Sequence, residues 1–143
     1  MTSSIFPDVN VWLAIHHRIH SHHESAMHWF ASLDESAIFV FCRQTQMGFF
    51  RLMTTEAVLG GDVITQRQCW AIYDRWIEGG KSILAGEPSS LNEALRLRTS
   101  VDSPSPKTWM DAYLAAFAET AHLTLVTFDR ALAVKAKGAV LLN

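Results

Sequence analysis

The sequence predicts an α/β domain in three layers, with helices on both faces of a central, mainly parallel sheet. Short apolar runs alternate with amphipathic helical patterns along the whole chain, which is typical of βαβ units. The 143 residues, of which 49% are hydrophobic, are enough for one domain with one core. No repeat and no low-complexity segment interrupts the alternation. We therefore expect a single α/β/α domain over residues 1–143.

The expected strands are short and mostly apolar, as strands between two layers of helices should be. The first strand ends close to Pro7. The fourth, Leu-Thr-Leu-Val-Thr, is strongly β-like because of its β-branched side chains. The five expected strands cover residues 4–8, 37–41, 82–85, 123–127 and 139–142.

The expected helices carry apolar side chains at positions i, i+3, i+4 and i+7. Ala26, Trp29, Phe30 and Leu33 have this spacing in the second helix. Thr65 is the expected N-cap of the fourth. Helices are expected after residue 8, over 25–33, 43–53, 66–77 and 90–97, from before residue 111 to 121, and over 130–137. The segment that contains the glycines at 60 and 61 is expected to be a loop.

Four oxygen-bearing side chains are expected to meet at one edge of this sheet. Right-handed crossovers place the C-terminal ends of parallel strands at a common edge, where ligands bind. Asp8 follows the first expected strand and Asp129 follows the fourth. Asp111 and Gln46 lie in the opening turns of helices that can point into the same crevice. The predicted topology therefore gathers three carboxylates and one amide.

Such a group favours a divalent cation. Converging carboxylates repel one another until a cation relieves the repulsion, and hard cations prefer oxygen ligands. A bound cation can activate water and stabilise charge on a scissile phosphate, so the pattern indicates a metal-dependent nuclease. In this hypothesis Asp8 and Asp129 hold the metal. Asp111 completes the coordination or orients the attacking water, and Gln46 assists through its carbonyl oxygen.

Five further residues are candidates for supporting roles. Asn10 and Thr127 can orient a carboxylate or a metal-bound water, although Asn10 can equally cap a helix and Thr127 can simply favour a strand. Arg51 and Arg130 are candidate phosphate contacts, while a lone surface Arg is usually only solvated. Trp109 is the candidate for stacking on an RNA base, because most other tryptophans fit apolar helix stripes.

Four segments together resemble a known family. Asp-Val-Asn-Val-Trp-Leu-Ala begins at Asp8, Thr-Gln-Met-Gly-Phe-Phe-Arg-Leu-Met-Thr at Thr45, Trp-Met-Asp-Ala-Tyr-Leu-Ala at Trp109 and Thr-Phe-Asp-Arg at Thr127. In this order they resemble a PIN-domain ribonuclease, specifically a VapC-type toxin of a toxin–antitoxin pair. The resemblance covers nearly the whole chain and implies a single PIN-like domain.

The resemblance also implies an activity and partners. Its acidic pocket would bind Mg2+ or Mn2+ and cut single-stranded RNA, a cognate antitoxin would block the pocket, and the protein would form a homodimer. Asp8, Asp111 and Asp129 match acidic residues of the family. Gln46 stands where the family more usually has Glu, so the lost charge should weaken any second metal position.

Composition limits the other functions. The apolar runs are far shorter than the roughly 20 residues that span a bilayer, and the first residues lack the pattern of a secretory signal, so we expect a cytoplasmic protein without a membrane span. Cys42 and Cys69 have no CxxC spacing. With 12 Lys and Arg against 14 Asp and Glu, the net charge is −2. RNA binding would therefore need a local basic surface.

Four alternatives compete with the nuclease. A histidine-rich segment contains His16 and His20 at H-x3-H spacing; it lacks HExxH and a third ligand, so we interpret it as a solvated or partner-facing cluster. A catalytically weakened PIN-like module could bind RNA or a partner without turnover. A phosphohydrolase with Asp8 as nucleophile is disfavoured because no second acid follows two residues later. A nucleotide-binding oxidoreductase lacks GxGxxG and GxxxxGK[ST].

Overall fold

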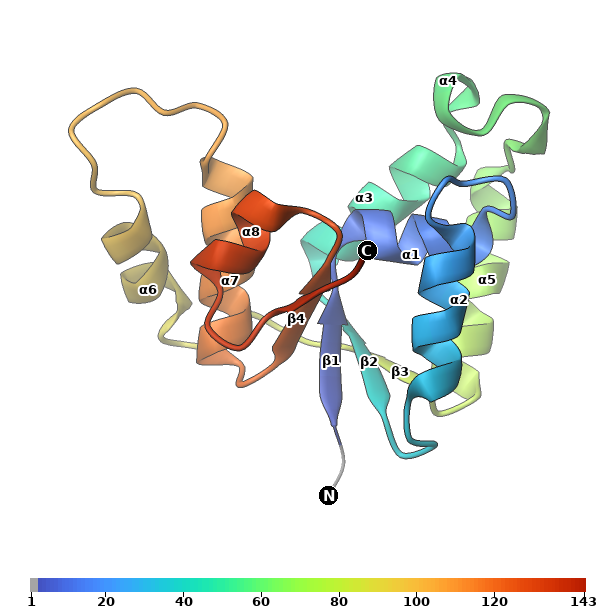
Figure 1. Ribbon diagram of the computed structural model, residues 1–143, viewed down its shortest axis with the longest axis horizontal. Helices are drawn as coiled ribbons and strands as arrows, with labels where there is room; N and C mark the ends of the chain where they lie inside the picture. Colours follow the sequence, from blue (N-terminus) through green and yellow to red (C-terminus); the bar gives the residue numbers. More distant parts are fainter. Residues whose placement is uncertain (1–2) are drawn as a thin grey trace.

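The computed structural model describes residues 3–143 and has a five-stranded sheet at its centre (Figure 1). The strand order is β3-β2-β1-β4-β5, and every neighbouring pair is parallel. The strands are β1 (Ser4–Pro7), β2 (Ile38–Phe41), β3 (Ser82–Leu84), β4 (Thr124–Thr127) and β5 (Val140–Leu141). The predicted fold class is confirmed.

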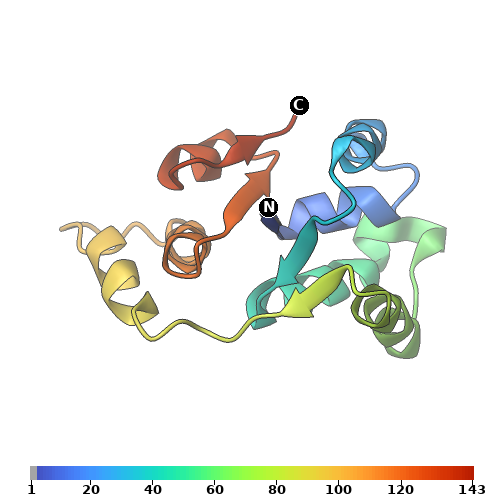
Figure 2. The same cartoon turned by 90° about the horizontal axis from the view of Figure 1, so that it is seen from below.

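Helices form a layer on each side of the sheet (Figure 2). One layer contains α1 (Val9–His16), α2 (His23–Ser32), α3 (Arg43–Met53) and α5 (Gln66–Glu78). The other contains α6 (Leu91–Arg98), α7 (Trp109–Thr120) and α8 (Arg130–Lys135). The chain runs from β1 outward to β3, then returns to the other side of β1 for β4 and β5. The topological switch point therefore lies between β1 and β4.

The segment expected to be a loop around residue 60 contains a short helix. Residues Glu56–Leu59 form α4, and a 3-10 turn, η1, covers Gly60–Asp62. Leu59 is buried in the core between α3 and α5, which holds this turn in place. Gly60 then takes a left-handed backbone conformation with φ of 57°. Four residues are too few for a helical apolar period to be visible in sequence.

The core layer on the side of α1, α3 and α5 is built around Trp12 of α1. Its ring is fully buried, stacks on Phe41 with ring centroids 4.0 Å apart, and meets Trp76 of α5 edge-on at 5.1 Å. Aromatic pairs of this geometry contribute about 0.5–1.5 kcal/mol each beyond their buried area. This packing fixes the rotation of α1, and with it the position of the residue that precedes the helix.

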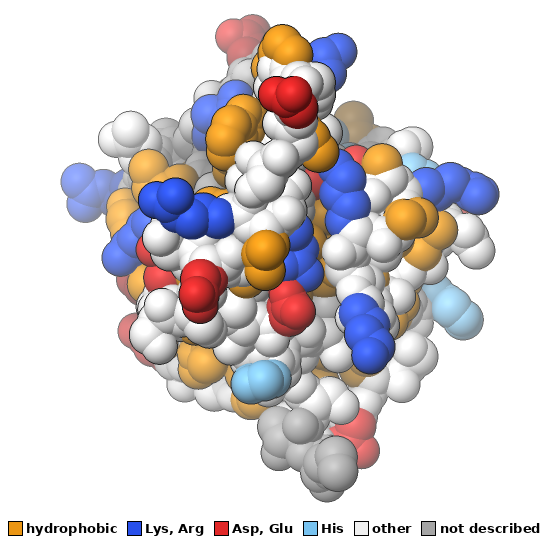
Figure 3. Space-filling model, turned by 90° about the vertical axis from the view of Figure 1, so that its left-hand side faces the viewer, with side chains coloured by type: hydrophobic (Ala, Val, Ile, Leu, Met, Phe, Trp, Pro, Cys, Tyr) orange, Lys and Arg blue, Asp and Glu red, His pale blue; other side chains and the backbone are white. Residues whose placement is uncertain are grey.

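On the opposite side, the face that carries α6 and α7 is mixed in charge. Lys and Arg side chains lie there among acidic and hydrophobic ones, with no single sign dominating (Figure 3). A phosphate backbone that met this face would find individual cations, not a continuous basic field. None of the helices within residues 3–143 is both long and apolar enough to cross a membrane.

Candidate active site

Two aspartates lie at the topological switch point of the sheet. Asp8 follows β1 and Asp129 follows β4, and these strands are direct neighbours (Figure 1). The Asp8 N–H donates to the carbonyl of Val126 in β4 at 3.0 Å, so the end of β1 is tied to its neighbour. The parallel topology brings together two carboxylates that are 121 positions apart in sequence. This is the edge at which open α/β sheets bind ligands.

Asp8 is a buried helix cap. Its Oδ1 accepts a hydrogen bond from the Val11 N–H at 3.2 Å, which caps α1. Its Oδ2 accepts a hydrogen bond from the hydroxyl of Thr127, and the residue is only 6% exposed. Burial raises the pKa of Asp8, its hydrogen bonds act in the opposite direction, and the charge of Asp129 raises it further. A cation beside Asp8 would relieve both unfavourable effects.

Thr127 connects the two aspartates. Its hydroxyl donates to Asp8 and accepts from the backbone N–H of Asp129 at 2.9 Å. The residue is fully buried at the end of β4, so the hydroxyl has little freedom to turn elsewhere. Thr127 thus orients one carboxylate directly and positions the other through its backbone.

Asp129 is the exposed member of the pair. Its Oδ1 accepts hydrogen bonds from the N–H groups of Ala131 at 2.8 Å and Leu132 at 3.3 Å, which caps α8. Both hydrogen bonds use the same oxygen. Oδ2 is therefore the oxygen of Asp129 that is suited to contact a ligand.

Asp111 lies in the first turn of α7, as expected, and is half-buried. Its Oδ2 is 3.7 Å from Nζ of Lys135 at the end of α8. Within residues 3–143, no three Asp, Glu, His or Cys side chains are grouped closely enough to hold a metal ion. The structure therefore brings Asp8 and Asp129 together, while Asp111 faces a lysine.

Gln46 is buried in α3, and its contacts are with Arg43 and Tyr73. It is only 1% exposed, its Oε1 accepts from Arg43 Nη1 at 2.6 Å, and it contacts the hydroxyl of Tyr73 in α5. Gly48 is two residues further and thus on the opposite side of α3. A Cβ added at Gly48 would lie 2.8 Å from Val9, the residue after Asp8. None of these contacts of Gln46 supports its expected role beside the acidic pair.

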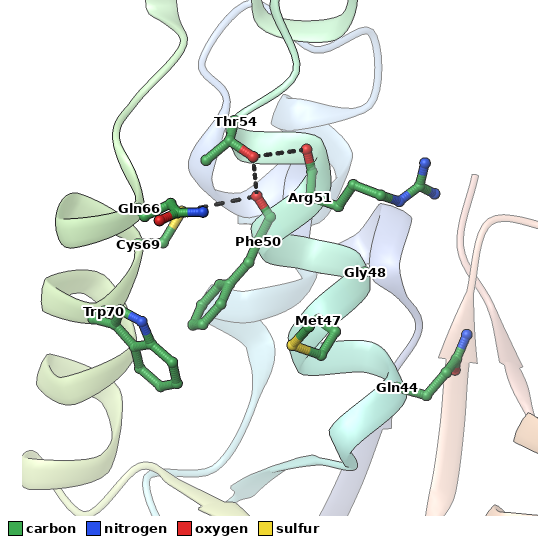
Figure 4. Close-up of a pocket in the computed structure, with 9 residues that line it drawn as sticks. All are labelled: Gln44, Met47, Gly48, Phe50, Arg51, Thr54, Gln66, Cys69 and Trp70. Atoms are coloured by element: carbon green, nitrogen blue, oxygen red, sulfur yellow. Dashed lines mark hydrogen bonds between the residues drawn. The ribbon is translucent and has the colours of Figure 1, made fainter.

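The face of α3 directed toward α1 carries Gln44, Gly48 and Arg51 at i, i+4 and i+7. Gln44 and Arg51 extend from α3 on the side away from α5, whereas Phe50 lies between α3 and α5 (Figure 4). Gln44 was missed in the sequence because nothing local distinguishes it from Gln46. The signal that identifies it is the small residue one turn later, which marks the helix face in close contact with α1.

The other candidate residues lie on the surface. Asn10, Arg51 and Arg130 are exposed, and Trp109 is 54% exposed. The backbone N–H of Asn10 lowers the pKa of Asp8, which is a main-chain effect. These positions are accessible to RNA, but no protein contact in the described residues assigns them a function.

The histidine-rich segment has a different role from the acidic pair. His16 Nε2 accepts from the indole N–H of Trp76 at 3.0 Å, and His16 Nδ1 is 2.8 Å from the carbonyl of Trp12. These partners require a neutral ring with the proton on Nδ1, and burial lowers the pKa of His16 accordingly. His16 therefore belongs to the aromatic core and is not free to pair with His20.

The fold and the acidic pair together define the class of protein. The parallel α/β/α order with two aspartates at the switch point is that of a PIN domain, and solved structures share the fold. VapC20 of Mycobacterium tuberculosis, a Sarcin-Ricin loop cleaving toxin, aligns with TM-score 0.64 and 14% identity over 91% of this chain and 93% of that one. PAE2754 of Pyrobaculum aerophilum aligns with TM-score 0.56 and 25% identity over 98% and 91%.

Sequence similarity identifies the family. The chain is 41% identical over 128 residues to ribonuclease VapC41 of Mycobacterium tuberculosis H37Rv, covering 87% of this chain and 88% of the relative. It belongs to the VapC family of ribonucleases. FitAB bound to IR36 DNA also shares the fold, with TM-score 0.57 and 19% identity over 96% of this chain and 93% of that one. No model in a scan of protein families matches the chain.

Proposed function

We propose that this protein is an endoribonuclease that hydrolyses single-stranded RNA with Mg2+ or Mn2+, and that it acts in the cytoplasm as the toxin of a toxin–antitoxin pair. Membership of a ribonuclease family supports RNA hydrolysis. The observation that carries the metal-dependent mechanism is buried Asp8, joined to Asp129 through Thr127 at the switch point. A buried carboxylate with a raised pKa beside a second carboxylate favours a bound cation.

The residues at the sheet edge suit a hard cation. Asp8 Oδ2 and Asp129 Oδ2 would hold it, and Asp111 would join when its carboxylate turns from Lys135. A cation bound there supplies an activated water and stabilises charge on the phosphate. Thr127 keeps the Asp8 carboxylate in one orientation during turnover, because its hydroxyl is already engaged on both sides.

The proposed partners follow from the same family. A cognate antitoxin would cover the acidic edge, and two copies of the chain would form a homodimer. The neighbour FitAB is a complex bound to DNA, which is consistent with partner proteins around this fold. A test is co-expression with the product of an adjacent gene, followed by measurement of mass by light scattering and of inhibition of RNA cleavage.

One observation favours a second candidate, a weakened PIN-like module that binds RNA or a partner without turnover. Gln46 replaces the usual Glu and is directed toward α5, and no three-ligand cluster is present among residues 3–143. Turnover separates the two candidates, because a binding module would retain RNA affinity and produce no cleavage with any metal.

Cleavage of a mixed panel of RNAs with Mg2+ or Mn2+ tests the proposal. We expect cleavage that EDTA abolishes and that Asp8→Asn lowers by about 1000-fold, as expected when charge stabilisation and water activation are both lost. Asp102→Asn is the matched control, because Asp102 is an exposed acid on the loop before α7. Undiminished cleavage by a folded Asp8→Asn protein would refute the mechanism.

A further inference from the structure

A groove of about 470 Å³ lies between the first turns of α3 and α7. Trp109, Met110 and Tyr113 of α7 form one wall, and Arg43, Gln44 and Met47 of α3 form the other. Leu95 and Glu87 complete the lining. Three of the apolar side chains are unusually exposed: Trp109 at 54%, Met110 at 48% and Met47 at 57%. Isolated exposed apolar side chains are normal on a protein surface, but several that line one groove are typical of a binding site.

The groove lies at the same edge of the sheet as the acidic pair. Helix α3 begins just after β2 ends, and α7 begins at that edge before it runs back to the start of β4. Trp109 and Asp111 are two residues apart in the first turn of α7, so their side chains leave the helix on opposite sides and α7 separates a ligand group in the groove from Asp111. That arrangement suits a nucleotide next to the one whose phosphate is cleaved, since the two are covalently joined.

Gln44 supplies an unsatisfied polar group at the same place. Its Oε1 is buried and has no hydrogen-bond partner among the described residues, although most buried polar atoms have one. The side chain extends from α3 on the side away from α5 (Figure 4). An unpaired amide can accept from and donate to the edge of a base, which is how Asn and Gln recognise bases.

A cation is also held at the groove. Arg43 is exposed, and its Nη1 donates to the buried Oε1 of Gln46 at 2.6 Å. Gln46 in turn contacts Tyr73 and is anchored in the core. The guanidinium is therefore positioned beside the groove with donors left for a phosphate. This contact gives Gln46 a positioning role for Arg43.

We infer that the groove between α3 and α7 is a nucleobase subsite for single-stranded RNA, in which Trp109 stacks on an unpaired base and Gln44 reads its edge. The inference rests on the proposed ribonuclease function and adds where the nucleotide next to the scissile phosphate is recognised. Arg43 contacts the adjoining phosphate. The combination of an aromatic face, a free amide and a cation fits a nucleotide better than an apolar peptide.

Trp70 provides a matched control. It is a tryptophan of α5 with similar exposure, 46%, and it lines the neighbouring groove between α3 and α5, which shares only Gln44 and Met47 with the groove between α3 and α7 (Figure 4). With the most readily cleaved RNA of the panel, we expect Trp109→Ala to raise KM about tenfold, the loss of one stacked base. Trp109→Phe should stay within about threefold because it keeps a stacking face, and Trp70→Ala within about twofold.

Gln44→Leu gives the second readout. Leucine matches glutamine in size but cannot pair with a base, so the nucleotide preference at one position beside the cleaved bond should be lost. Equal effects of Trp109→Ala and Trp70→Ala, or an unchanged preference in Gln44→Leu, would overturn the inference. A change from dimer to monomer in Trp109→Ala, measured by light scattering, would also overturn it, because the groove would then be an interface between copies.

Failure of the proposed function can be separated from failure of the subsite. If the wild-type protein cleaves no RNA, the affinity for a fluorescein-labelled single-stranded RNA is measured by anisotropy with the same variants. Weaker binding by Trp109→Ala, with Trp70→Ala unchanged, would support the subsite although the nuclease proposal fails. No binding by the wild-type protein, or equal affinities throughout, would overturn the subsite.

Discussion

The acidic edge and the histidine-rich segment each contain several potential metal ligands, but the fold uses them differently. Six of the seven histidines lie between residues 16 and 28, whereas Asp8 and Asp129 are distant in sequence. Parallel strand pairing nevertheless joins the aspartates through one threonine. Three of the histidine rings, those of His16, His20 and His23, instead contact nearby backbone atoms or an indole: His23 Nδ1, for example, is 2.6 Å from the Ala14 carbonyl.

Proximity in sequence is therefore a poor guide to a shared site. The neighbouring rings of His20 and His22 are 5.8 Å apart, but His20 Nδ1 accepts from the His22 N–H, and the ring of His22 stacks on Phe128. Residues at the ends of parallel strands have a common direction imposed by the sheet. Substitutions in the two regions should consequently have different effects. Those at the acidic edge should alter catalysis, and those in the histidine-rich segment should alter stability.

Among variants that keep both aspartates, the largest effect is expected from Thr127→Val, which preserves the shape of the side chain and removes the hydroxyl between the two aspartates. Loss of a group that orients a ligand typically lowers activity 10- to 100-fold, and we expect a decrease in kcat/KM near the upper end. Thr127→Ser should restore most of the activity, because it retains the hydroxyl. Similar low activity in both variants would indicate that packing, not hydrogen bonding, is what Thr127 contributes.

His16→Ala should lower the free energy of unfolding by about 2 kcal/mol, because it leaves the Trp76 N–H without its partner inside the core. Urea unfolding measures this change. His20→Ala is the control and should stay within about 0.5 kcal/mol. RNA cleavage per folded molecule should be unchanged in both. A loss of cleavage in folded His16→Ala would show that the segment contributes to the site.

The third prediction concerns stability in the absence of metal. Because the pKa of Asp8 is higher in the folded protein than its ordinary value of 3.8, its contribution to stability is fully present below that value and is lost as pH rises through the folded pKa. Asp8→Asn does not ionise. At pH 7 with EDTA, the variant should therefore have a higher Tm than the wild type. Each kcal/mol gained in the free energy of unfolding should raise Tm by about 3–5 °C.

Thermal unfolding from pH 3 to pH 8 measures this difference. The advantage of Asp8→Asn should shrink as pH falls, because Asp8 of the wild type then becomes protonated. Added Mg2+ should stabilise the wild type and leave Asp8→Asn unchanged. A wild type that is the more stable protein at pH 7 with EDTA would mean that the hydrogen bonds to Asp8 outweigh its burial.

The smallest effect is expected from Lys135→Ala. The ammonium group lies 3.7 Å from Asp111 Oδ2 and competes with a bound cation for that carboxylate. Its removal should lower the Mg2+ concentration that gives half-maximal cleavage by about threefold, while the free energy of unfolding changes by less than about 1 kcal/mol, as is usual for a partly exposed ion pair. Lys137→Ala is the control. A higher Mg2+ requirement would show that Lys135 supports the site.

Much of the architecture could be predicted from periodicity. The apolar runs located all five strands, and the helical spacing of Ala26, Trp29 and Phe30 located α2, although this helix begins at His23, two residues earlier than expected. Helix α4 was missed because its four residues are too short to show a period. Burial of Leu59 in the core stabilises this helix, and burial depends on the tertiary structure, which local periodicity does not show.

The candidate site could also be predicted in part, because some of its residues are placed by the order of strands and helices along the chain. The positions of Asp8 and Asp129 at strand ends follow from the order of elements, and the switch point between β1 and β4 follows from the topology. The direction of Gln46 did not follow, because a sequence places a residue in a helical turn without stating how the helix is rotated. Close contact between Gly48 and Val9 sets that rotation and places Gln44 on the side of α3 away from α5 (Figure 4).

The sequence alone determined the alternation of strands and helices, the family resemblance and the acids at the strand ends, because these depend on local periodicity and on chain order. Only the tertiary structure decided which side chains meet. Packing of Trp12 on Phe41 and of His16 on Trp76 sets the orientation of α1 and removes one histidine from metal chemistry. The direction of a side chain depends on the rotation of its helix, which is fixed by contacts between residues far apart in the chain.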